Sequence, residues 1–446
     1  MFSTTDTIVA IATPPGRGGI GVVRISGPDA CVIAGALREA DAPLEPRRAT
    51  FAKLRSGEQP IDHAVITFFP APRSYTGDDV IEISAHGSPV ILRAIVGAAV
   101  AGGARLAEPG EFTLRAFLNS RVDLAQAEAV ADLIDAVTPL QARAAFDQLD
   151  GTLTERIASI DATLFDLIAR LEASVDFPEE GYHFIESREL VDALDGLLAH
   201  TTSLLADGRR GRVIREGFQI AIVGKPNVGK SSLFNALAGA PRAIVTPTPG
   251  TTRDLITEIV DVNGLRVTLV DSAGIRTTDD DVESVGVDLA RRAMRIADAV
   301  LVVVDGSGAL DDSDVEILRE TTACRRVVVA NKCDLRLEAP GGFLAVSART
   351  GAGLARLRDE LAAVLDVDPT RDQPAITNLR HVTLVEHAHD ALSRARAGVL
   401  EQGPALSEEF VLADLQSARA ALEEISGRRA ADDLLAHIFA RFCVGK

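Results

Sequence analysis

The chain has 446 residues, with 64 acidic and 46 basic side chains and a formal net charge of −18 at neutral pH. This length exceeds one ordinary core, so two or three domains are expected, and the composition, 47% hydrophobic and 25% charged, is typical of a globular protein. So acidic a surface repels phosphates and disfavours unaided nucleic-acid binding. A nucleic-acid substrate would need a local basic patch or a basic partner.

The cysteines and the hydrophobic pattern indicate an intracellular protein. The chain contains four cysteines, which are widely scattered: Cys31, Cys324, Cys333 and Cys443. They form no Cys-x-x-Cys pair, so neither a disulfide framework nor a zinc site is predicted. The opening residues lack a basic stretch and meet two successive prolines, so we expect no signal peptide. Since no apolar run approaches the length of a membrane span, we expect a cytoplasmic protein that does not associate with membranes.

Residues 1–120 are predicted to form an α+β domain. The β-rich runs are Thr7–Ala12, Ile20–Ile25, Ala64–Phe69 and Val80–Ser84, and helical patterns occupy Ala30–Glu39 and Pro89–Ala101. Arg24 and Glu82 are charged residues inside two apolar strands. The pattern alone favours the ordinary explanation, in which each side chain points to the solvent face of its strand.

Residues 121–213 and 372–446 are predicted to be two parts of one helical bundle, interrupted by an inserted domain at 214–371. Apolar residues recur at helical spacing in both parts. The helical stretches run from Val122 to Pro139, then over Leu140–Val175, Leu190–Leu205, Thr377–Leu400, Ser407–Gly427 and Ala430–Phe442. A coiled-coil interaction module is the alternative for the helical parts alone.

The inserted domain begins with a nucleotide-binding motif. Phe218–Val223 is an apolar, β-branched run that predicts a buried strand, and the eight residues after it match G-x-x-x-x-G-K-[ST] before a helical pattern begins. The glycines let backbone N–H groups surround a phosphate chain, and the helix presents its N-terminus to the same charge. A tight turn would explain one glycine but not the Gly-Lys-Ser sequence. The predicted nucleotide contacts here are Asn227, Val228, Gly229, Lys230, Ser231 and Ser232.

Within this motif, Lys230 is expected to neutralise the outer phosphates, and the Ser231 hydroxyl is expected to bind Mg²⁺. The following apolar strands predict a Ras-like α/β domain, with a mainly parallel sheet and one antiparallel edge strand. They are Leu255–Val262 and Leu265–Val270, which a hairpin turn at Asn263-Gly264 is predicted to join, and Ala299–Val304, Val327–Ala330 and Phe343–Val346. Ligands of such sheets bind at the carboxyl ends of the strands.

Polar motifs follow these strands in the order expected of a GTP-binding domain. Asp271 is expected to reach Mg²⁺ through water, and Thr252, in the predicted first switch, to complete the coordination of Mg²⁺. The Asp334 carboxylate can accept hydrogen bonds from the N1–H and N2–H₂ groups of guanine, a pair that adenine lacks. The further predicted contacts are Ser272, Ala273, Gly274, Asn331, Lys332, Ser347 and Ala348.

The residue after the Asp271–Gly274 motif is Ile275, whereas Ras-type enzymes have a water-orienting Gln. A hydrophobic side chain cannot orient water. Another group must position the attacking water, and the following loop, IRTTDDDVESVG, offers acidic residues.

The whole chain resembles the MnmE (TrmE) family of tRNA-modification GTPases. At the N-terminus the resemblance lies in DTIVAIATPPGRGGIGVVRISGP, SYTGDDVIEISAHG and AEPGEFTLRAFLNSRVDLAQAEAVADLIDA; at the C-terminus it lies in Cys443-Val444-Gly445-Lys446. The family has the same inserted G domain. It acts on the wobble uridine of tRNA with an FAD-dependent partner, MnmG (GidA), and forms homodimers through its N-terminal domain.

The resemblance implies a folate site that the residue pattern alone does not predict. In this interpretation Arg24, Glu82, Arg121 and Lys446 contact 5-formyl-tetrahydrofolate or a related folate, the one-carbon donor. The family often has Lys where this chain has Arg121, which keeps the charge but changes the hydrogen-bond geometry. Cys443 would lie near the modification chemistry as a candidate catalytic residue. The alternative is a semi-buried thiol at a helix end.

The resemblance also assigns the catalytic groups of the G domain. Glu283 would be the water-orienting residue, although an acid at this place would also suit the start of a helix. K⁺ would take the place of an arginine finger during dimerisation of two G domains. Its ligands, which are also counted among the GTP contacts, would be Asn227, Thr246, Thr248 and Thr251. Pro247 and Pro249 depart from the family pattern and stiffen this loop, so they either pre-form the ion cage or impede its closure.

We therefore predict a GTP-hydrolysing tRNA-modification enzyme that installs an aminomethyl or carboxymethylaminomethyl group at C5 of the wobble uridine. One alternative is a ribosome-assembly GTPase of the Era or Der type, which shares the Ile-for-Gln feature. Such proteins append an RNA-binding domain or a second G domain, whereas this sequence has one P-loop motif and no basic appended module. The other alternative is a non-enzymatic, GTP-dependent recruitment switch.

Overall fold

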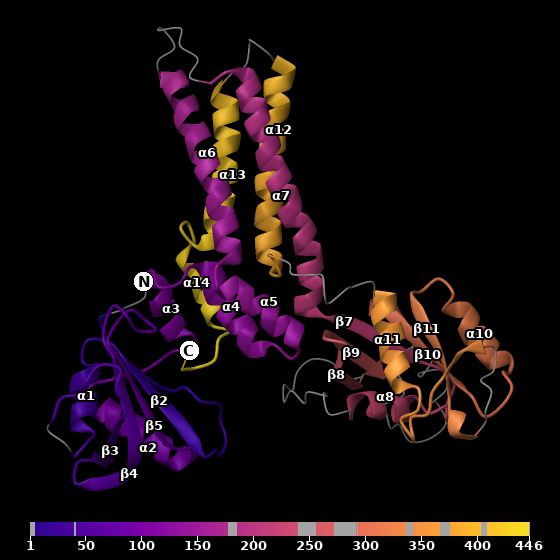
Figure 1. Ribbon diagram of the computed structural model, residues 1–446, viewed down its shortest axis with the longest axis horizontal. Coiled ribbons are helices and arrows are strands. Elements are labelled where there is room, and N and C mark those ends of the chain that lie inside the picture. Colours follow the sequence, from indigo (N-terminus) through magenta and orange to yellow (C-terminus); the bar gives the residue numbers. More distant parts are fainter. Residues whose placement is uncertain are drawn as a thin grey trace. The chain divides into compact units, whose positions relative to one another are not determined.

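The computed structural model describes residues 5–39, 42–176, 185–239, 256–271, 291, 293–335, 342–365, 375–402 and 408–445. The chain divides into two compact units. The first comprises residues 1–131, 154–162 and 419–446, and the second comprises residues 132–153 and 163–418. Figure 1 shows that the first unit combines both ends of the chain, since it contains indigo segments from the N-terminus and yellow segments from the C-terminus. The predicted division at residues 120, 213 and 371 stays a prediction.

The first unit contains a six-stranded sheet in the order β3-β4-β5-β2-β1-β6. Its strands are β1 (Ile8–Ile11), β2 (Ile20–Ser26), β3 (Thr50–Ser56), β4 (Gln59–Phe69), β5 (Val80–His86) and β6 (Arg105–Leu106). All neighbouring pairs are antiparallel except β1 and β6. Helices α1 (Ala30–Ala36) and α2 (Pro89–Ala101) share a core with one face of the sheet, where Ile33 and Ile95 are buried with Ile83.

The sequence prediction missed β3, which pairs with β4 as an edge hairpin. Only Ala52 and Leu54 of β3 are buried, while Phe51, Lys53 and Arg55 alternate with them and are exposed. Such a short run, with two inward side chains, gives little periodic signal. Strand β4 begins at Gln59, earlier than the predicted Ala64, and none of its first five residues is buried.

A smaller core joins the two ends of the chain within the first unit. Helices α3 (Glu111–Leu118), α4 (Leu124–Asp135) and α14 (Asp432–Phe439) contribute to it. Leu114 and Leu124 are buried there with Leu435, Phe439 and Phe442. The last helix therefore packs against α3 and α4, although more than 300 residues of the chain separate Leu124 from Leu435.

The predicted helices form, with two differences in their bounds. The remaining helices of this region are α5 (Pro139–Leu149), α6 (Thr152–Asp176), α7 (Ser187–Glu216), α12 (Leu379–Gln402) and α13 (Glu408–Ser426). The pattern predicted as continuous from Leu140 breaks after Leu149, because Gly151 adopts a left-handed conformation with φ +98°. Helix α7 runs to Glu216, well past the predicted end at Leu205, and leads through Gly217 into the next strand.

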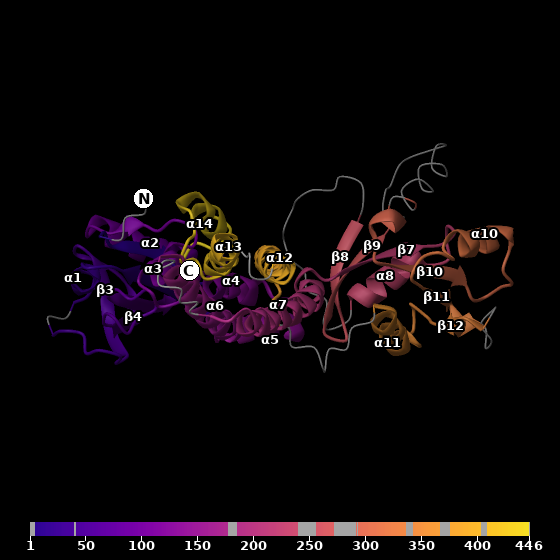
Figure 2. The same ribbon diagram turned by 90° about the horizontal axis from the view of Figure 1, so that it is seen from above.

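Within the second unit, α7 and α12 lie side by side along most of their length (Figures 1 and 2). Two glycines of α7 permit close contacts, one with α12 itself and one with the segment that precedes it. A Cβ atom on Gly208 would lie 2.7 Å from the Val382 side chain, and one on Gly211 would lie 1.8 Å from the carbonyl oxygen of Ile376.

The second unit also contains the predicted nucleotide-binding sheet, in the order β12-β11-β10-β7-β9-β8. The strands are β7 (Phe218–Val223), β8 (Ile256–Val262), β9 (Leu265–Asp271), β10 (Ala299–Asp305), β11 (Arg326–Asn331) and β12 (Leu344–Ala345). The helices are α8 (Lys230–Ala238), α10 (Asp312–Glu320) and α11 (Leu354–Leu365), and a short 3₁₀ helix is η2 (Cys333–Leu335). Only the β8–β9 pair is antiparallel, as predicted. The predicted turn at Asn263-Gly264 joins these strands, both residues having positive φ.

Among the described residues, no helix is both long enough and apolar enough to cross a membrane.

Candidate functional site

The loop between β7 and α8 has the conformation that its sequence predicts. Gly224 has φ +153°, and a Cβ atom there would lie 2.2 Å from the carbonyl oxygen of Val303. Gly229 has φ +93° and is the N-cap of α8. A Cβ atom on Gly229 would lie 2.3 Å from Nδ2 of Asn331. Any other residue at either position would collide with the neighbouring strand ends, so both glycines are required by close packing as well as by φ.

Lys230 is the first residue of α8, and only 8% of it is exposed. Its Nζ atom donates to the carbonyl oxygens of Gly224 at 2.8 Å and Lys225 at 2.7 Å. The ammonium group therefore lies inside the loop, where a phosphate chain would be surrounded by backbone N–H groups. Ser231 and Ser232 follow in the first turn of the helix, and Asn227 has φ +64°.

The base-recognition residues come together as predicted. The Asn331 side chain links the phosphate-binding loop to the Ser347-Ala348 pair. Its Nδ2 donates to the Val228 carbonyl at 2.9 Å, and its Oδ1 accepts from the Ala348 N–H at 3.0 Å. Ser347 Oγ donates to Asp334 Oδ1 at 2.7 Å, and this hydrogen bond lowers the pKa of Asp334. Asp334 is thus an oriented carboxylate at neutral pH, as an acceptor for guanine N–H donors must be.

Lys332 of the same motif contacts a residue that the sequence reasoning overlooked. Its Nζ atom lies 2.6 Å from Oδ2 of Asp305, the last residue of β10. Burial opposes ionisation of Asp305, but hydrogen bonds from Lys332 and Ser307 outweigh it and lower the pKa of this carboxyl group. The signal was present in the sequence, because Asp305 directly follows an apolar strand, as the other site residues do.

Several predicted GTP, Mg²⁺ and K⁺ residues lie outside the described residues: Thr246, Thr248, Thr251, Thr252, Ser272, Ala273, Gly274 and Glu283. Asp271 is the last residue of β9, at the carboxyl end of the parallel sheet. Its backbone position beside Ile222 of β7 is consistent with the prediction. The roles of these residues stay predictions.

The second candidate site lies on the first unit's sheet, where Arg24 of β2 is directly opposite Glu82 of β5. The Arg24 guanidinium donates to Glu82 Oε1 from Nε at 3.0 Å and from Nη2 at 2.7 Å. It also lies over the rings of Tyr75, at 5.0 Å, and Phe112, at 5.7 Å. The solvent-face explanation is therefore wrong for Arg24, whose side chain is 14% exposed, because α3 and the Tyr75 loop cover this face.

The C-terminal tail reaches the same place. Arg24 Nη1 donates to the Gly445 carbonyl at 3.2 Å, and the Gly110 N–H donates to the Cys443 carbonyl at 3.4 Å. Gly445 has φ +98°, and a Cβ atom there would lie 2.4 Å from the carbonyl oxygen of Ile11. Cys443 is exposed. The tail is thus held by main-chain contacts that leave the thiol accessible.

Of the other two predicted folate residues, the structure describes only Arg121. The Arg121 stem lies beside Gly77, since a Cβ atom on that glycine would be 3.3 Å from Arg121 Cγ. Over the described ranges, the Arg121 side chain makes no hydrogen bond or ion pair with Arg24 or Glu82. Lys446 lies outside the described residues. Tyr75 and Phe112, which the sequence reasoning did not single out, are the residues that position Arg24.

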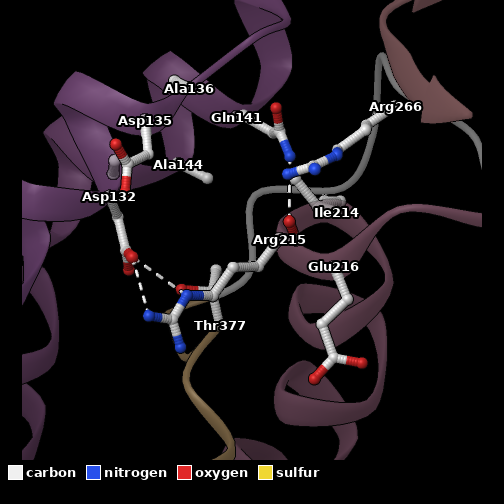
Figure 3. Close-up of a pocket in the computed structure, with 11 residues that line it drawn as sticks. Asp132, Asp135, Ala136, Gln141, Ala144, Ile214, Arg215, Glu216, Arg266 and Thr377 are labelled. Carbon is white, nitrogen blue, oxygen red and sulfur yellow. Dashed lines mark hydrogen bonds and ion pairs between the residues drawn. The ribbon is translucent and has the colours of Figure 1, made fainter. Parts of the chain in front are cut away.

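A cavity of about 270 Å³ lies where α4, α5 and α7 meet β9 in the second unit (Figure 3). Arg215 Nη2 lies 2.7 Å from Asp132 Oδ1 at its edge, and Gln141 Nε2 donates to the Arg215 carbonyl at 2.9 Å. Arg266 of β9 also lines the cavity. Of the predicted nucleotide, metal and folate residues that the structure describes, none lines it.

Within the described part of the chain, no group of three or more His, Cys, Asp or Glu side chains is arranged to hold a metal ion. That finding does not bear on the predicted Mg²⁺ site, whose predicted ligands are hydroxyl groups. The Ser231 oxygen at the start of α8 is a hard donor of the type that Mg²⁺ prefers.

Comparisons with known proteins agree with this architecture. Residues 7–121 match the model of the GTP-binding protein TrmE N-terminus, and residues 124–443 match that of the MnmE helical domain. A tRNA modification GTPase MnmE from Koribacter versatilis is 44% identical over 99% of both chains, and one from Nitrosospira multiformis is 42% identical over 100% of both. The solved GTPase Era, in complex with MgGDPNP and part of 16S ribosomal RNA, is 26% identical over 39% of this chain and 66% of its own, with a TM-score of 0.27. The two family models and the full-length relatives together show that this chain belongs to the MnmE family.

Proposed function

We propose that this protein hydrolyses GTP and that its GTPase cycle controls the modification of C5 of the wobble uridine in certain tRNAs. The added group would be aminomethyl or carboxymethylaminomethyl. The support for tRNA as substrate is the full-length identity of 42–44% to proteins named tRNA modification GTPases. The observation that carries the choice of GTP is the Asp334 carboxylate, oriented by Ser347 and linked through Asn331 to the phosphate loop.

In this proposal each residue of the nucleotide site has a stated task. Lys230 neutralises phosphate charge inside the loop, and Asp334 accepts from the guanine edge. Ser231, with Thr252, holds Mg²⁺, which when bound neutralises phosphate charge. Asn227, with the carbonyls of Thr246 and Thr248 and with Thr251, holds K⁺. Glu283 orients the attacking water.

The one-carbon unit would come from 5-formyl-tetrahydrofolate or a related folate, bound beside Arg24 and Glu82. A folate carries carboxylates that suit Arg24, Arg121 and Lys446, and a pterin whose N–H groups suit Glu82. Cys443 would lie at the reacting end of this site. The exposed thiol and the anchored tail support that arrangement.

We further propose that the protein acts in the cytoplasm as a homodimer and with an FAD-dependent partner of the MnmG (GidA) type. The net charge of −18 supports a partner that supplies much of the attraction for tRNA. A partner with a basic surface would satisfy this electrostatic requirement.

The test is mass-spectrometric analysis of tRNA nucleosides from cells that lack the gene. The cells are complemented with wild type, Asp334→Asn or Cys443→Ser, and the amount of each protein is measured. We expect the C5 modification to be absent from the deleted strain and restored by wild type alone. An unchanged nucleoside profile in the deleted strain would contradict the proposal and favour ribosome assembly.

A further inference from the structure

A lysine in the phosphate-binding loop is held from outside the loop. Lys225, directly after Gly224, places its Nζ atom 2.5 Å from Asp311 Oδ2 and 2.8 Å from Asp314 Oδ2. The Lys225 side chain is 22% exposed and that of Asp314 is 3% exposed. The ammonium group therefore points away from the phosphate position and towards the start of α10.

Both carboxylates are held by hydrogen bonds within the first turn of α10. Asp311 is the N-cap of α10, and its Oδ1 accepts from the Asp314 N–H at 3.1 Å. Asp314 Oδ2 accepts from the Asp311 N–H at 3.2 Å, which completes a capping box. Because each acid is anchored by the helix terminus, this ion pair differs from a mobile surface pair, whose side chains must be ordered on forming it.

The main chain of Lys225 is part of the phosphate-binding loop. Its carbonyl oxygen accepts a hydrogen bond from Lys230 Nζ, and the next residue but one, Asn227, has φ +64°. A left-handed conformation at a residue other than glycine costs free energy and persists only where its surroundings fix it. The ion pair lies on the exposed side of that loop and supplies such a constraint.

We propose that Lys225, Asp311 and Asp314 form a clamp that positions the phosphate-binding loop for GTP hydrolysis. The clamp links the N-terminus of α10 to the carbonyl group that orients Lys230. Lys225 acts through Lys230 and touches no substrate, so it is a positioning residue. The inference rests on the proposed GTP hydrolysis.

The test compares full-length variants in steady-state GTP hydrolysis at saturating Mg²⁺ and K⁺. Lys225→Met keeps the aliphatic stem and removes the charge, Lys225→Arg restores it, and Arg291→Met is the control. Arg291 forms a 2.7 Å ion pair with Glu320 at the other end of α10, away from the loop. Melting temperatures are measured for every variant.

We expect Lys225→Met to lower kcat about tenfold or more, since small displacements of a catalytic group are costly. Lys225→Arg should recover most of this loss, and Arg291→Met should change kcat by less than about twofold. Combining Lys225→Met with Asp314→Asn should cost no more than Lys225→Met alone, because the two residues act as one unit.

The clamp would be contradicted by a Lys225→Met enzyme with kcat and KM within about twofold of wild type. It would also be contradicted if Lys225→Arg failed to rescue while the melting temperature was unchanged. A wild-type protein without GTPase activity in the same assay would contradict the proposed function instead, so the two failures can be told apart.

Discussion

Arg24 is a charged side chain whose partners are distant in the sequence. Glu82 lies opposite it on the next strand, the Tyr75 and Phe112 rings lie beside it, and the Gly445 carbonyl arrives from the other end of the chain. Strand alternation predicts which face Arg24 points to, but it cannot tell what covers that face. The resemblance to a family singled out Arg24 and Glu82, and the tertiary structure supplied the partners.

A substitution of Gly445 tests whether the position of the C-terminal tail matters for tRNA modification. Gly445→Ala should displace the tail, because its left-handed φ and the 2.4 Å approach of a Cβ atom to the Ile11 carbonyl leave no room for a methyl group. We expect loss of most C5-modified uridine while the GTPase rate stays within about twofold of wild type. The measurements are nucleoside mass spectrometry and GTP hydrolysis on the same protein.

Val444→Ala is the matched control for the tail. Val444 is 52% exposed, and truncation there should leave both activities unchanged. Full modification by Gly445→Ala would show that the anchored conformation of the tail is dispensable.

At the scale of single elements, the long helix α7 contains two glycines in opposite environments. A Cβ atom on Gly211 would lie 1.8 Å from the Ile376 carbonyl, whereas one on Gly196 meets nothing within 4 Å. Gly211→Ala should lower the free energy of unfolding by about 1–3 kcal/mol through overpacking. Gly196→Ala should raise it by about 0.5–1 kcal/mol, because alanine favours the helix.

Urea unfolding followed by circular dichroism measures these two free energies. Equal effects of both substitutions would mean that the contact between α7 and the segment before α12 does not depend on the absence of a side chain at residue 211. Sequence periodicity alone does not distinguish these two glycines.

The ion pair between Arg215 and Asp132, at the edge of the cavity beside α4 and α7, can be tested by substitution as well (Figure 3). Arg215→Met should destabilise the protein by about 1–3 kcal/mol, because Asp132, whose side chain is only 17% exposed, would lose its charged partner. Arg212→Met removes an exposed pair with Glu216 in the same helix and should cost at most about 0.5 kcal/mol. The melting temperatures of the two variants measure the difference, and a larger shift for Arg212→Met would contradict this ranking.

At the scale of the whole molecule, acid resistance should depend on an ion-pair cluster that ties residue 6 to the start of α3. Arg115 is 1% exposed and binds both Asp6 and Glu111, and Arg105 binds the same two acids. Burial opposes ionisation of Glu111, but hydrogen bonds from Arg105, the Glu108 N–H and Arg115 outweigh it and lower its pKa below 4.5. The hydrogen bond from Arg105 lowers the pKa of Asp6 in the same direction.

A lowered carboxyl pKa in the folded state stabilises the protein above the unfolded pKa and ceases to do so as the pH falls through the folded value. Glu111→Gln should therefore lower the free energy of unfolding by about 1–3 kcal/mol at pH 7. The difference from wild type should shrink as the pH falls below about 4.5. Urea titrations at several pH values measure it, and a difference that grows with acidity would contradict the assignment.

The sequence predicted the architecture where local patterns carry it. The strands of the nucleotide-binding domain, its one antiparallel edge strand, the turn at Asn263-Gly264 and the phosphate-binding loop follow from periodicity and turn chemistry. The sequence prediction failed at the edge strand β3, where few side chains are buried. It also failed at the break after Leu149, which follows from the left-handed conformation of Gly151. Tyr75 and Phe112 contact Arg24, which is far away from them in the sequence, so no local pattern predicts their role.

The contact between Gly211 and Ile376 has a consequence for how the chain folds. Helix α7 precedes the nucleotide-binding domain in the chain, whereas Ile376, which Gly211 contacts, follows it. Closing a flexible loop of about 160 residues would cost about 4–5 kcal/mol in chain entropy. If the inserted domain folds first, it converts that loop into a compact body with neighbouring ends, so its own folding prepares the assembly of the bundle around it.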